Sequence, residues 1–462
     1  MASVNPSRTS DDAEIDRQIL RIAGPAAIAL LTDPLYELTD VAILSTLGSE
    51  ALGGAALAVR VLSLTYATFI FLTFATTARV ARLRGKGDTV GATETAISAV
   101  WIACALGVGL MAVLALAGRP ILQALGGEGD VLETAWVYLR TSIWGLPAFL
   151  IVLAGTGYLR GCSDTKTPLL ISAAAVALNL ILEVVLIFGL NAGVEASAGG
   201  TVVAKWFSAA VLLVFISRDR SANGVSLRPV WAHARRLGRV GGSLVLRTAA
   251  LLGTITAASS LAARLGVSAL AAHSIVFGIW MFSVFASDGI EVAGQTLIAQ
   301  HLGRNGGLPD RRRLVGRLLR WSLIVGCGLG AILVVLRSPL IGLFTNDSSV
   351  ITLAQTPLWC LALLQPINAV TFGVDGILVG AGRQSRLALF MASAAVGFGL
   401  TVWGGYAVAP AQDRLATVWI ALTVFSVIRC ALGLYATFQF TRSVTQPSEQ
   451  QPRSPRHTRE SW

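Results

Sequence analysis

Long apolar stretches, separated by short clusters of charge, glycine and proline, follow one another along the chain from residue 18 to residue 441. About twenty apolar residues wound as a helix cross the roughly 30 Å hydrocarbon core of a bilayer. Of the 462 residues, 13% are charged and 54% are hydrophobic, whereas a soluble domain carries about 25% charged residues. This pattern predicts an integral membrane protein and excludes a single soluble core with a membrane anchor.

The apolar stretches divide into about twelve expected transmembrane helices. Their ranges are 18–46, 52–79, 91–117, 131–158, 167–190, 196–217, 238–264, 269–301, 312–337, 350–380, 385–409 and 414–441. Several are rich in Gly, Ala, Ser and Thr, which favours helices that pack against helices or line a polar cavity. The expected fold class is therefore an all-α polytopic membrane protein.

Basic residues set the expected orientation. With the N-terminus inside, 27 of the 36 Lys and Arg fall on the cytoplasmic side and five on the other. Such an excess is typical of cytoplasmic loops, so both termini are expected in the cytoplasm, with the chain in a bacterial cell membrane. The net charge of +11 then reflects topology and not nucleic-acid binding, because no aromatic platform is interleaved with it. Four basic residues remain inside helices: Arg140, Lys205, Arg247 and Arg429.

The two halves of the chain repeat each other. The segment LGSEALGGAALAV at Leu47 recurs as LGVSALAAHSIV at Leu265, and Gly85 matches Gly303, both at an offset of 218. Pro147, Gly157 and Gly161 match Pro366, Gly376 and Gly380 at an offset of 219. Because each half has an even number of crossings, the repeat is parallel and predicts two six-helix lobes with a cleft between them.

This organisation predicts five segments. They are a cytoplasmic N-terminal arm at 1–17, an N-lobe at 18–217, a cytoplasmic linker at 218–237, a C-lobe at 238–441 and a disordered cytoplasmic tail at 442–462. The tail is rich in Gln, Pro, Ser and Arg, a composition that buries too little apolar surface to fold.

Acidic residues in the first helix are candidate functional groups, because an acid inside a membrane requires a partner, a wet cavity or a function. Asp33, Glu37 and Asp40 lie close to one helix face. Pro34 removes a backbone donor and Pro25 lies below it, so the helix is expected to bend near these acids. For Asp33 and Glu37, exposure to an aqueous vestibule is the favoured alternative to a direct role.

The fifth helix carries Asn179 and Glu183 one turn apart. Glu183 and Asp40 each lie about seven residues, or about 10 Å, below the outer helix ends, so they are expected at similar depth. Two acids close together in a low-dielectric pocket can share and exchange a proton. The alternative is that Lys205, at comparable depth on helix six, neutralises Glu183 in a static ion pair.

The second lobe has its own intramembrane charges. Counting along the helices places Arg247, Asp288 and Asp375 in the cytoplasmic half of the membrane, where they are expected to form one cluster. Gating of the cleft, ion coupling and a structural clamp all fit such a cluster.

Other classes of site find no support in the sequence. The five cysteines are scattered singly, without the spacing of a disulfide framework or a zinc site. No Walker pattern G-x-x-x-x-G-K-[ST], nucleophile elbow or metal triad is present. We therefore expect no enzyme activity, no metal and no cofactor beyond a coupling ion.

These residues resemble the multidrug and toxic compound extrusion (MATE) family, especially its DNA-damage-inducible protein F branch. The first helix, with IAGPAAIAL and YELTDVAILSTLG, is similar to the family's Pro, Tyr and Asp pattern at Pro25, Tyr36 and Asp40. YLRGCSDTKTPLLISAAAVALNLILEVVLIFG resembles the segment that ends in Asn, three residues and Asp. LRTAALLG, ASDGIEVAGQTLIAQHLG and VDGILVGAG resemble helices seven, eight and ten, with Arg247, Asp288 and Asp375 as charged members.

The resemblance implies a proton-coupling and substrate pocket made of Tyr36, Asp40, Asn179, Glu183 and Thr201. Glu183 stands where the family usually has Asp, and Lys205 lies one turn from Thr201, as a possible modulator together with Asp33 and Glu37. The sodium-coupled branch carries acids on helices seven and ten, where Leu251 and Asn368 stand here. This difference favours H⁺ as the coupling ion.

The expected function is secondary active efflux of lipophilic or cationic xenobiotics by alternating access, in antiport with protons, by a monomer in the lipid bilayer. Protonation of Asp40 would release a cation that the ionised acid attracts. A flippase for a lipid-linked precursor, which a strongly cationic cleft would indicate, and sodium-coupled export are alternatives. A non-transporting membrane receptor or scaffold is a candidate from another class.

Overall fold

The computed structural model describes residues 6–410 and 413–443; the side chains of residues 6–10, 33, 35–38 and 239 are not among those it describes. The described chain is helical and contains no strand. The helices are α1 (Pro6–Ser45), α2 (Ser49–Phe69), α3 (Phe71–Gly85), α4 (Thr89–Ala124), α5 (Gly129–Ser142), α6 (Leu146–Gly161), α7 (Lys166–Glu183), α8 (Val194–Ala222), α9 (Trp231–Arg264), α10 (Val267–Gly303), α11 (Leu308–Gly342), α12 (Ser348–Gly380), α13 (Gln384–Val408) and α14 (Arg414–Arg442).

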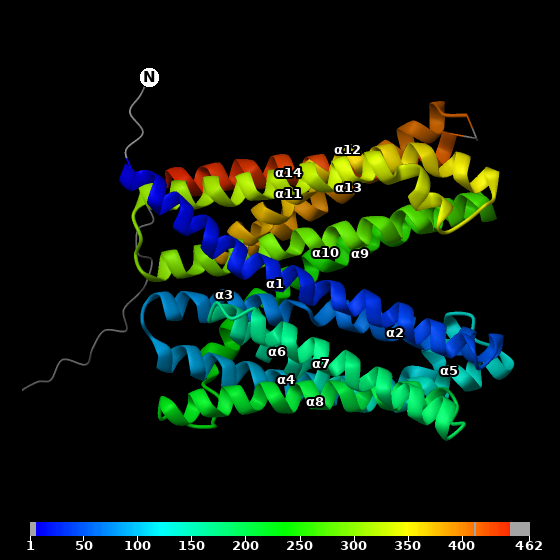
Figure 1. Ribbon diagram of the computed structural model, residues 1–462, viewed down its shortest axis with the longest axis horizontal. Helices are drawn as coiled ribbons and strands as arrows, with labels where there is room; N and C mark the ends of the chain where they lie inside the picture. The colour runs from blue at the N-terminus through cyan, green and yellow to red at the C-terminus, as the bar shows by residue number, and fades with distance from the viewer. Residues whose placement is uncertain (1–5, 411–412, 444–462) are drawn as a thin grey trace, which may run out of the picture.

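Short irregular turns join some of these helices into continuous crossings. A 3₁₀ turn, η1 (Ile143–Gly145), connects α5 to α6, and a π turn, η2 (Val184–Gly189), extends α7. Within the described residues, eleven continuous helical segments are long and apolar enough to span a bilayer. The 40-residue α1 crosses between the same two faces (Figure 1), and the predicted all-α polytopic fold is thus confirmed.

The helices form two groups, α2–α8 and α9–α14, with α1 running obliquely between them (Figure 1). We call these groups the N-lobe and the C-lobe. The beginning of α1 and the end of α14 lie at one face of the molecule, which we call the terminal face (Figure 1). The other face is the opposite face.

The predicted internal repeat is visible in the packing of repeat-related glycines. In the N-lobe, a Cβ on Gly157 would meet the backbone oxygen of Thr73, and in the C-lobe a Cβ on Gly376 would meet the backbone oxygen of Glu291. Thr73 and Glu291 are themselves 218 positions apart. The two lobes therefore bring equivalent helices into the same close contact, as expected for a parallel repeat.

The lobes contact each other near the terminal face. Gly85 and Gly303, which the repeat relates, meet there: a Cβ on Gly85 would contact the backbone oxygen of Gln300, and one on Gly303 that of Arg82. The Gln300 amide also donates to Ser163 Oγ of the N-lobe at 2.8 Å. Small residues allow this close approach of two backbones, so the lobes are sealed at this end.

A cavity of about 560 Å³ lies between α2 and α9, and we call it the interlobe cavity. Its lining is apolar with several hydroxyl groups. It consists of Leu64, Thr68, Val245, Thr248, Ala249, Leu252, Gly253, Thr256, Ala257 and Ser260. The structure therefore shows the lobes in close contact at the terminal face and a cavity between them further along α2 and α9.

The first helix of each half packs on both lobes. Ile19, Ile22 and Ala26 of α1 belong to an apolar core with α10 and α11 of the C-lobe, whereas Asp40 near the other end of α1 contacts the N-lobe. Conversely, Leu237 at the start of α9 is buried in an N-lobe core with α3, α4 and α6. Further along α9, Ala258 lies in the main C-lobe core.

Ion pairs fix the beginning of α1 to the C-lobe. Asp12 accepts from Arg313 Nε of α11 at 2.5 Å, and Asp16 accepts from Arg317 Nε at 2.7 Å and from Trp321 Nε1 at 2.9 Å. Within the expected N-terminal arm at 1–17, α1 begins at Pro6. α1 continues unbroken through Pro25 and Pro34, and the bend at Pro25 stays a prediction.

The connection between the lobes is shorter than the expected linker at 218–237. α8 continues to Ala222 and α9 begins at Trp231, because polar residues at a membrane surface can extend helices into water. The remaining segment, 223–230, is bound to α4: Trp101 Nε1 donates to Leu227 O at 2.8 Å, and the Val230 backbone N donates to Ser98 Oγ at 3.1 Å. Most of the predicted tail, 444–462, lies outside the described residues.

The seal at the terminal face yields a first prediction. A methyl group added by Gly303→Ala would overlap the backbone of Arg82, at a cost of about 1–3 kcal/mol to the sealed state. We expect Cys162, next to Ser163, to react faster with a membrane-impermeant thiol reagent in a variant whose other four cysteines are serine. Gly316→Ala, where nothing lies within 4 Å, is the control. Equal labelling of both variants would contradict the proposed seal.

Candidate functional site

Two buried carboxylates meet in the N-lobe near the opposite face. Asp40 of α1 is 6% exposed and Glu183, the last residue of α7, is 1% exposed. Ser197 of α8 lies between them, with its Oγ 2.5 Å from Asp40 Oδ1 and 3.0 Å from Glu183 Oε1. The predicted proximity of Asp40 and Glu183 is thus seen in the structure, with a serine hydroxyl as the bridge.

A serine hydroxyl carries one proton, so it donates a hydrogen bond to one carboxylate at a time. The second contact becomes a hydrogen bond when the other carboxyl group is protonated and donates to the serine oxygen. With both acids ionised, one of them lacks a donor at this position and both charges face each other in a buried site, which is costly. The geometry therefore suits a pair of acids that holds one proton between them.

Asn179 lies on the same face of α7 as Glu183, one turn away. Its side chain is buried, and neither its amide nitrogen nor its oxygen makes a hydrogen bond of normal geometry to the described residues. Gly200 of α8 makes room for it, since a Cβ at that position would lie 3.2 Å from Asn179 Oδ1. Buried amides are normally satisfied, and the side chain with which Asn179 interacts is the Glu183 carboxyl group.

The other residues expected in this pocket have different placements. Thr201 is half-buried one turn after Ser197, on the same face of α8. The Lys205 ammonium lies over the ring of Phe149, 5.6 Å from its centroid. Among the described residues it makes no ion pair with Glu183, so the static pair considered as an alternative is not formed. The side chains of Asp33, Tyr36 and Glu37 lie outside the described residues.

Ser197 is a pocket residue that the sequence-based reasoning missed. It lies four positions before Thr201 in VEASAGGTVV, so helical spacing places both hydroxyls on one face of α8. That spacing is the sequence feature that could have identified Ser197 as a pocket residue. Serine is, however, frequent in membrane helices that pack closely, so a single serine does not by itself indicate a pocket.

The C-lobe contains the predicted charge cluster, with Glu291 and Arg429 as further members. Asp375 of α12 accepts from Arg247 Nη2 of α9 at 2.5 Å and from Arg429 Nη2 of α14 at 2.9 Å. Glu291 of α10 lies 3.9 Å from Arg247 Nη2. All four side chains are buried, and together they tie four helices of the C-lobe to one another.

Asp288, expected in this cluster, interacts electrostatically with Arg247, Asp375 and Arg429, although it makes no ion pair within 4 Å in the described part of the chain. It is half-buried on α10, and Glu291, three residues further along the same helix, lies closer to Arg247. Counting along helices gives depth but not direction around the axis, so it did not show that Glu291 and Arg429 also belong to the cluster.

These features define the class of the protein. Within the described residues, two related groups of membrane-spanning helices have a cavity between them, and each group buries charged side chains, as in secondary transporters that work by alternating access. A family model described as MatE matches residues 25–185 and 249–403, once in each lobe. The chain belongs to this family, MATE, whose members are secondary transporters that export multiple drugs and are not enzymes.

Several curated proteins share this sequence pattern along most of their length. The chain is 32% identical to "Protein DETOXIFICATION 44, chloroplastic" of Arabidopsis thaliana over 436 residues, covering 91% of this chain and 82% of the relative. It is 28% identical to "DNA damage-inducible protein F" of Escherichia coli K12 over 431 residues, covering 90% of each. The expected family membership is thereby confirmed.

Solved structures show the same fold. The "bent form" of the Vibrio cholerae MATE transporter VcmN superposes with a TM-score of 0.85 at 18% identity, covering 94% of this chain and 98% of that one. An "outward-facing conformation" of a multidrug resistance MATE family transporter gives a TM-score of 0.84 at 19% identity, covering 92% and 96%.

The hydroxyl between the two acids yields a second prediction. Ser197→Ala removes a donor from a buried acid pair and should reduce the free energy of unfolding by about 1–3 kcal/mol. The loss should be larger at alkaline than at acidic pH, because only ionised carboxylates need the donor. Ser208→Ala on the same helix, whose hydroxyl bonds to Ala204 O, should lose little at either pH. Denaturant titration in detergent checks this, and a pH-independent loss in Ser197→Ala would count against the shared-proton geometry.

The C-lobe cluster yields a third prediction. Asp375→Asn leaves the guanidinium groups of Arg247 and Arg429 facing each other without their shared anion, which should cost about 3–5 kcal/mol of stability. Asp413→Asn, at an exposed position before α14, should change stability by less than about 0.5 kcal/mol. The midpoint of thermal unfolding in detergent measures both. A loss below about 1 kcal/mol in Asp375→Asn would contradict a dry, structural cluster.

Proposed function

We propose that this efflux transporter exchanges protons for lipophilic compounds, and that Asp40 and Glu183 hold the coupling proton. The observation that carries this proposal is the single hydroxyl of Ser197 between two buried carboxylates. Such a site gains or loses one proton without exposing a bare pair of charges. Asn179 and Thr201 would complete the pocket by hydrogen-bonding to whichever acid is ionised.

The interlobe cavity is the candidate site for the cargo. Its volume of about 560 Å³ falls within the range of roughly 300–1,000 Å³ typical of sites for drug-sized ligands. Its lining combines apolar side chains with four hydroxyl groups and includes no charged side chain. This chemistry favours lipophilic molecules with a few polar groups, cationic ones included, and lacks the strongly cationic lining that a flippase for a lipid-linked precursor would favour.

Helix α1 connects the Asp40–Glu183 pair with both lobes. It carries Asp40 in the N-lobe while Ile19 and Ile22 pack in the C-lobe. Protonation of the acid pair would change the hydrogen bonds between α1 and α8, and so the position of α1 between the lobes. If the proton and the cargo bind different arrangements of the lobes more tightly, binding of one lowers the affinity for the other, and this couples their transport.

The direction of transport follows from the charge bias. With 27 basic residues on the side of the termini and five on the other, the terminal face would be cytoplasmic, in a bacterial cell membrane. The contacts between the lobes at the terminal face would then form a seal toward the cytoplasm, as expected of a state that takes up protons and releases cargo on the other side. Leu251 and Asn368, neutral residues at the places where the sodium-coupled branch has acids, support H⁺ over Na⁺.

Transport assays in reconstituted vesicles test the proposal. With a pH gradient as the driving force, Asp40→Asn should abolish both dye export and the accompanying proton flux, because a fixed amide cannot exchange a proton. Asp130→Asn, at an exposed position in the first turn of α5, should leave both fluxes unchanged. Glu183→Gln is expected to impair transport as well. Proton-driven export that persists in Asp40→Asn would rule out this coupling site.

A further inference from the structure

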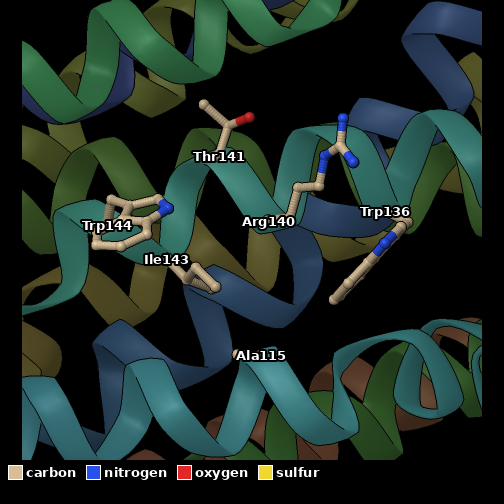
Figure 2. A pocket seen from close by; sticks show the side chains of 6 residues that line it. All are labelled: Ala115, Trp136, Arg140, Thr141, Ile143 and Trp144. Atoms are coloured by element: carbon tan, nitrogen blue, oxygen red, sulfur yellow. The ribbon is translucent and has the colours of Figure 1, made fainter.

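A second cavity, of about 420 Å³, lies on the N-lobe between α4 and the junction of α5 with η1. Figure 2 shows Arg140 between the indole rings of Trp136 and Trp144, with Ala115 on the neighbouring α4. Thr141 and Ile143 complete the lining. We call this cavity the Arg140 groove; it shares no lining residue with the interlobe cavity.

The Arg140 groove faces the lipid. Leu116 and Val113, next to Ala115 on α4, are 85% and 55% exposed, and Trp144 is 63% exposed. In a membrane-spanning helix such apolar side chains contact acyl chains. A ligand in this groove is therefore reached from the bilayer and not through the interlobe cavity.

Arg140 carries a charge into this apolar surface. It lies in the membrane-spanning segment Gly129–Gly161, eleven residues after Gly129, which is about 16 Å along the helix from the opposite face. An arginine at membrane depth costs several kcal/mol unless it reaches water, a counter-charge or a lipid headgroup. Its side chain is exposed, so the partner must come from outside the protein or from the protein surface.

The protein surface offers no counter-charge among the described residues. Arg140 makes no ion pair and no hydrogen bond there, and Glu133, two turns earlier on α5, is paired with Arg119 of α4. The hydroxyl of Thr141 donates to Val137 O of its own helix at 3.0 Å. A guanidinium with five donors is left facing the bilayer.

We propose that the Arg140 groove binds an anionic phospholipid from the leaflet nearer the opposite face. The guanidinium fork would pair with the lipid phosphate, a geometry that arginine matches with two parallel hydrogen bonds. The indoles of Trp136 and Trp144 suit the boundary between headgroup and acyl chain, and an acyl chain would lie over Ala115 and Ile143.

The C-lobe fills the corresponding position differently, which makes the groove specific to the N-lobe. At the repeat offset of 219, Arg140 corresponds to Trp359, whose ring is covered by Arg337 of α11 at 4.4 Å. There the guanidinium of Arg337 makes a cation–π contact with the indole of Trp359. Arg337 therefore serves as a matched control: a cationic side chain near the same face, with an aromatic partner within the protein.

Native mass spectrometry of the full chain in detergent tests the proposal. With matched acyl chains, phosphatidylglycerol should bind about tenfold more tightly than phosphatidylcholine, and Arg140→Gln should remove this preference. Arg140→Lys should keep part of it, because a lysine supplies the charge without the fork. Arg337→Gln should keep the whole preference. Circular dichroism confirms that each variant remains folded.

Three results would overturn the proposal. The first is a preference for phosphatidylglycerol that persists in Arg140→Gln, and the second is its equal loss in Arg337→Gln. The third is displacement of phosphatidylglycerol by inorganic phosphate, which would assign the groove to free anions and not to lipid. Export activity is not used in this test, so its outcome is independent of the proton-coupling site.

Discussion

A charged side chain inside a bilayer has to be solvated by the protein, because the surrounding hydrocarbon cannot do it. The two lobes meet this demand in different ways. In the C-lobe, Asp375 receives two guanidinium groups and the cluster is held by ion pairs between helices. In the N-lobe, Asp40 and Glu183 share one hydroxyl, and in the proposed mechanism they also share a proton. One lobe thus carries charges paired between helices, and the other carries two acids without a basic partner among the described residues.

This difference gives α1 a particular place in the molecule. Its first half is held by the C-lobe through apolar packing and through the ion pairs of Asp12 and Asp16. Its second half ends at Asp40, which contacts Ser197 of the N-lobe. Under the proposed proton coupling, a change of protonation would therefore act on an element that both lobes hold, as coupling between a local event and a global arrangement requires.

Much of this arrangement could be predicted from the sequence, and the limits of the prediction have a common cause. Hydropathy gave the membrane helices, the offset of 218 gave the repeat, and counting residues along helices placed Asp40 and Glu183 at the same depth. The direction of each side chain around its helix depends on packing, which no periodicity of a uniformly apolar helix reveals. For that reason Ser197, Glu291 and the contact of Lys205 with Phe149 were found only in the structure.

Because α1 and α9 each pack on both lobes, the chain passes from one lobe to the other within these two helices and not in the loop that joins the halves. Segment 223–230 is bound to α4, and the start of α9 is buried with the N-lobe, so the loop moves with the first half of the chain. Under the proposed alternating access, rocking of one lobe on the other would then be absorbed by bending within the helical backbone. α1 contains Pro25 and Pro34, and α9 contains Gly238, Gly241, Gly242 and Gly253; these residues weaken a helix where such bending is needed.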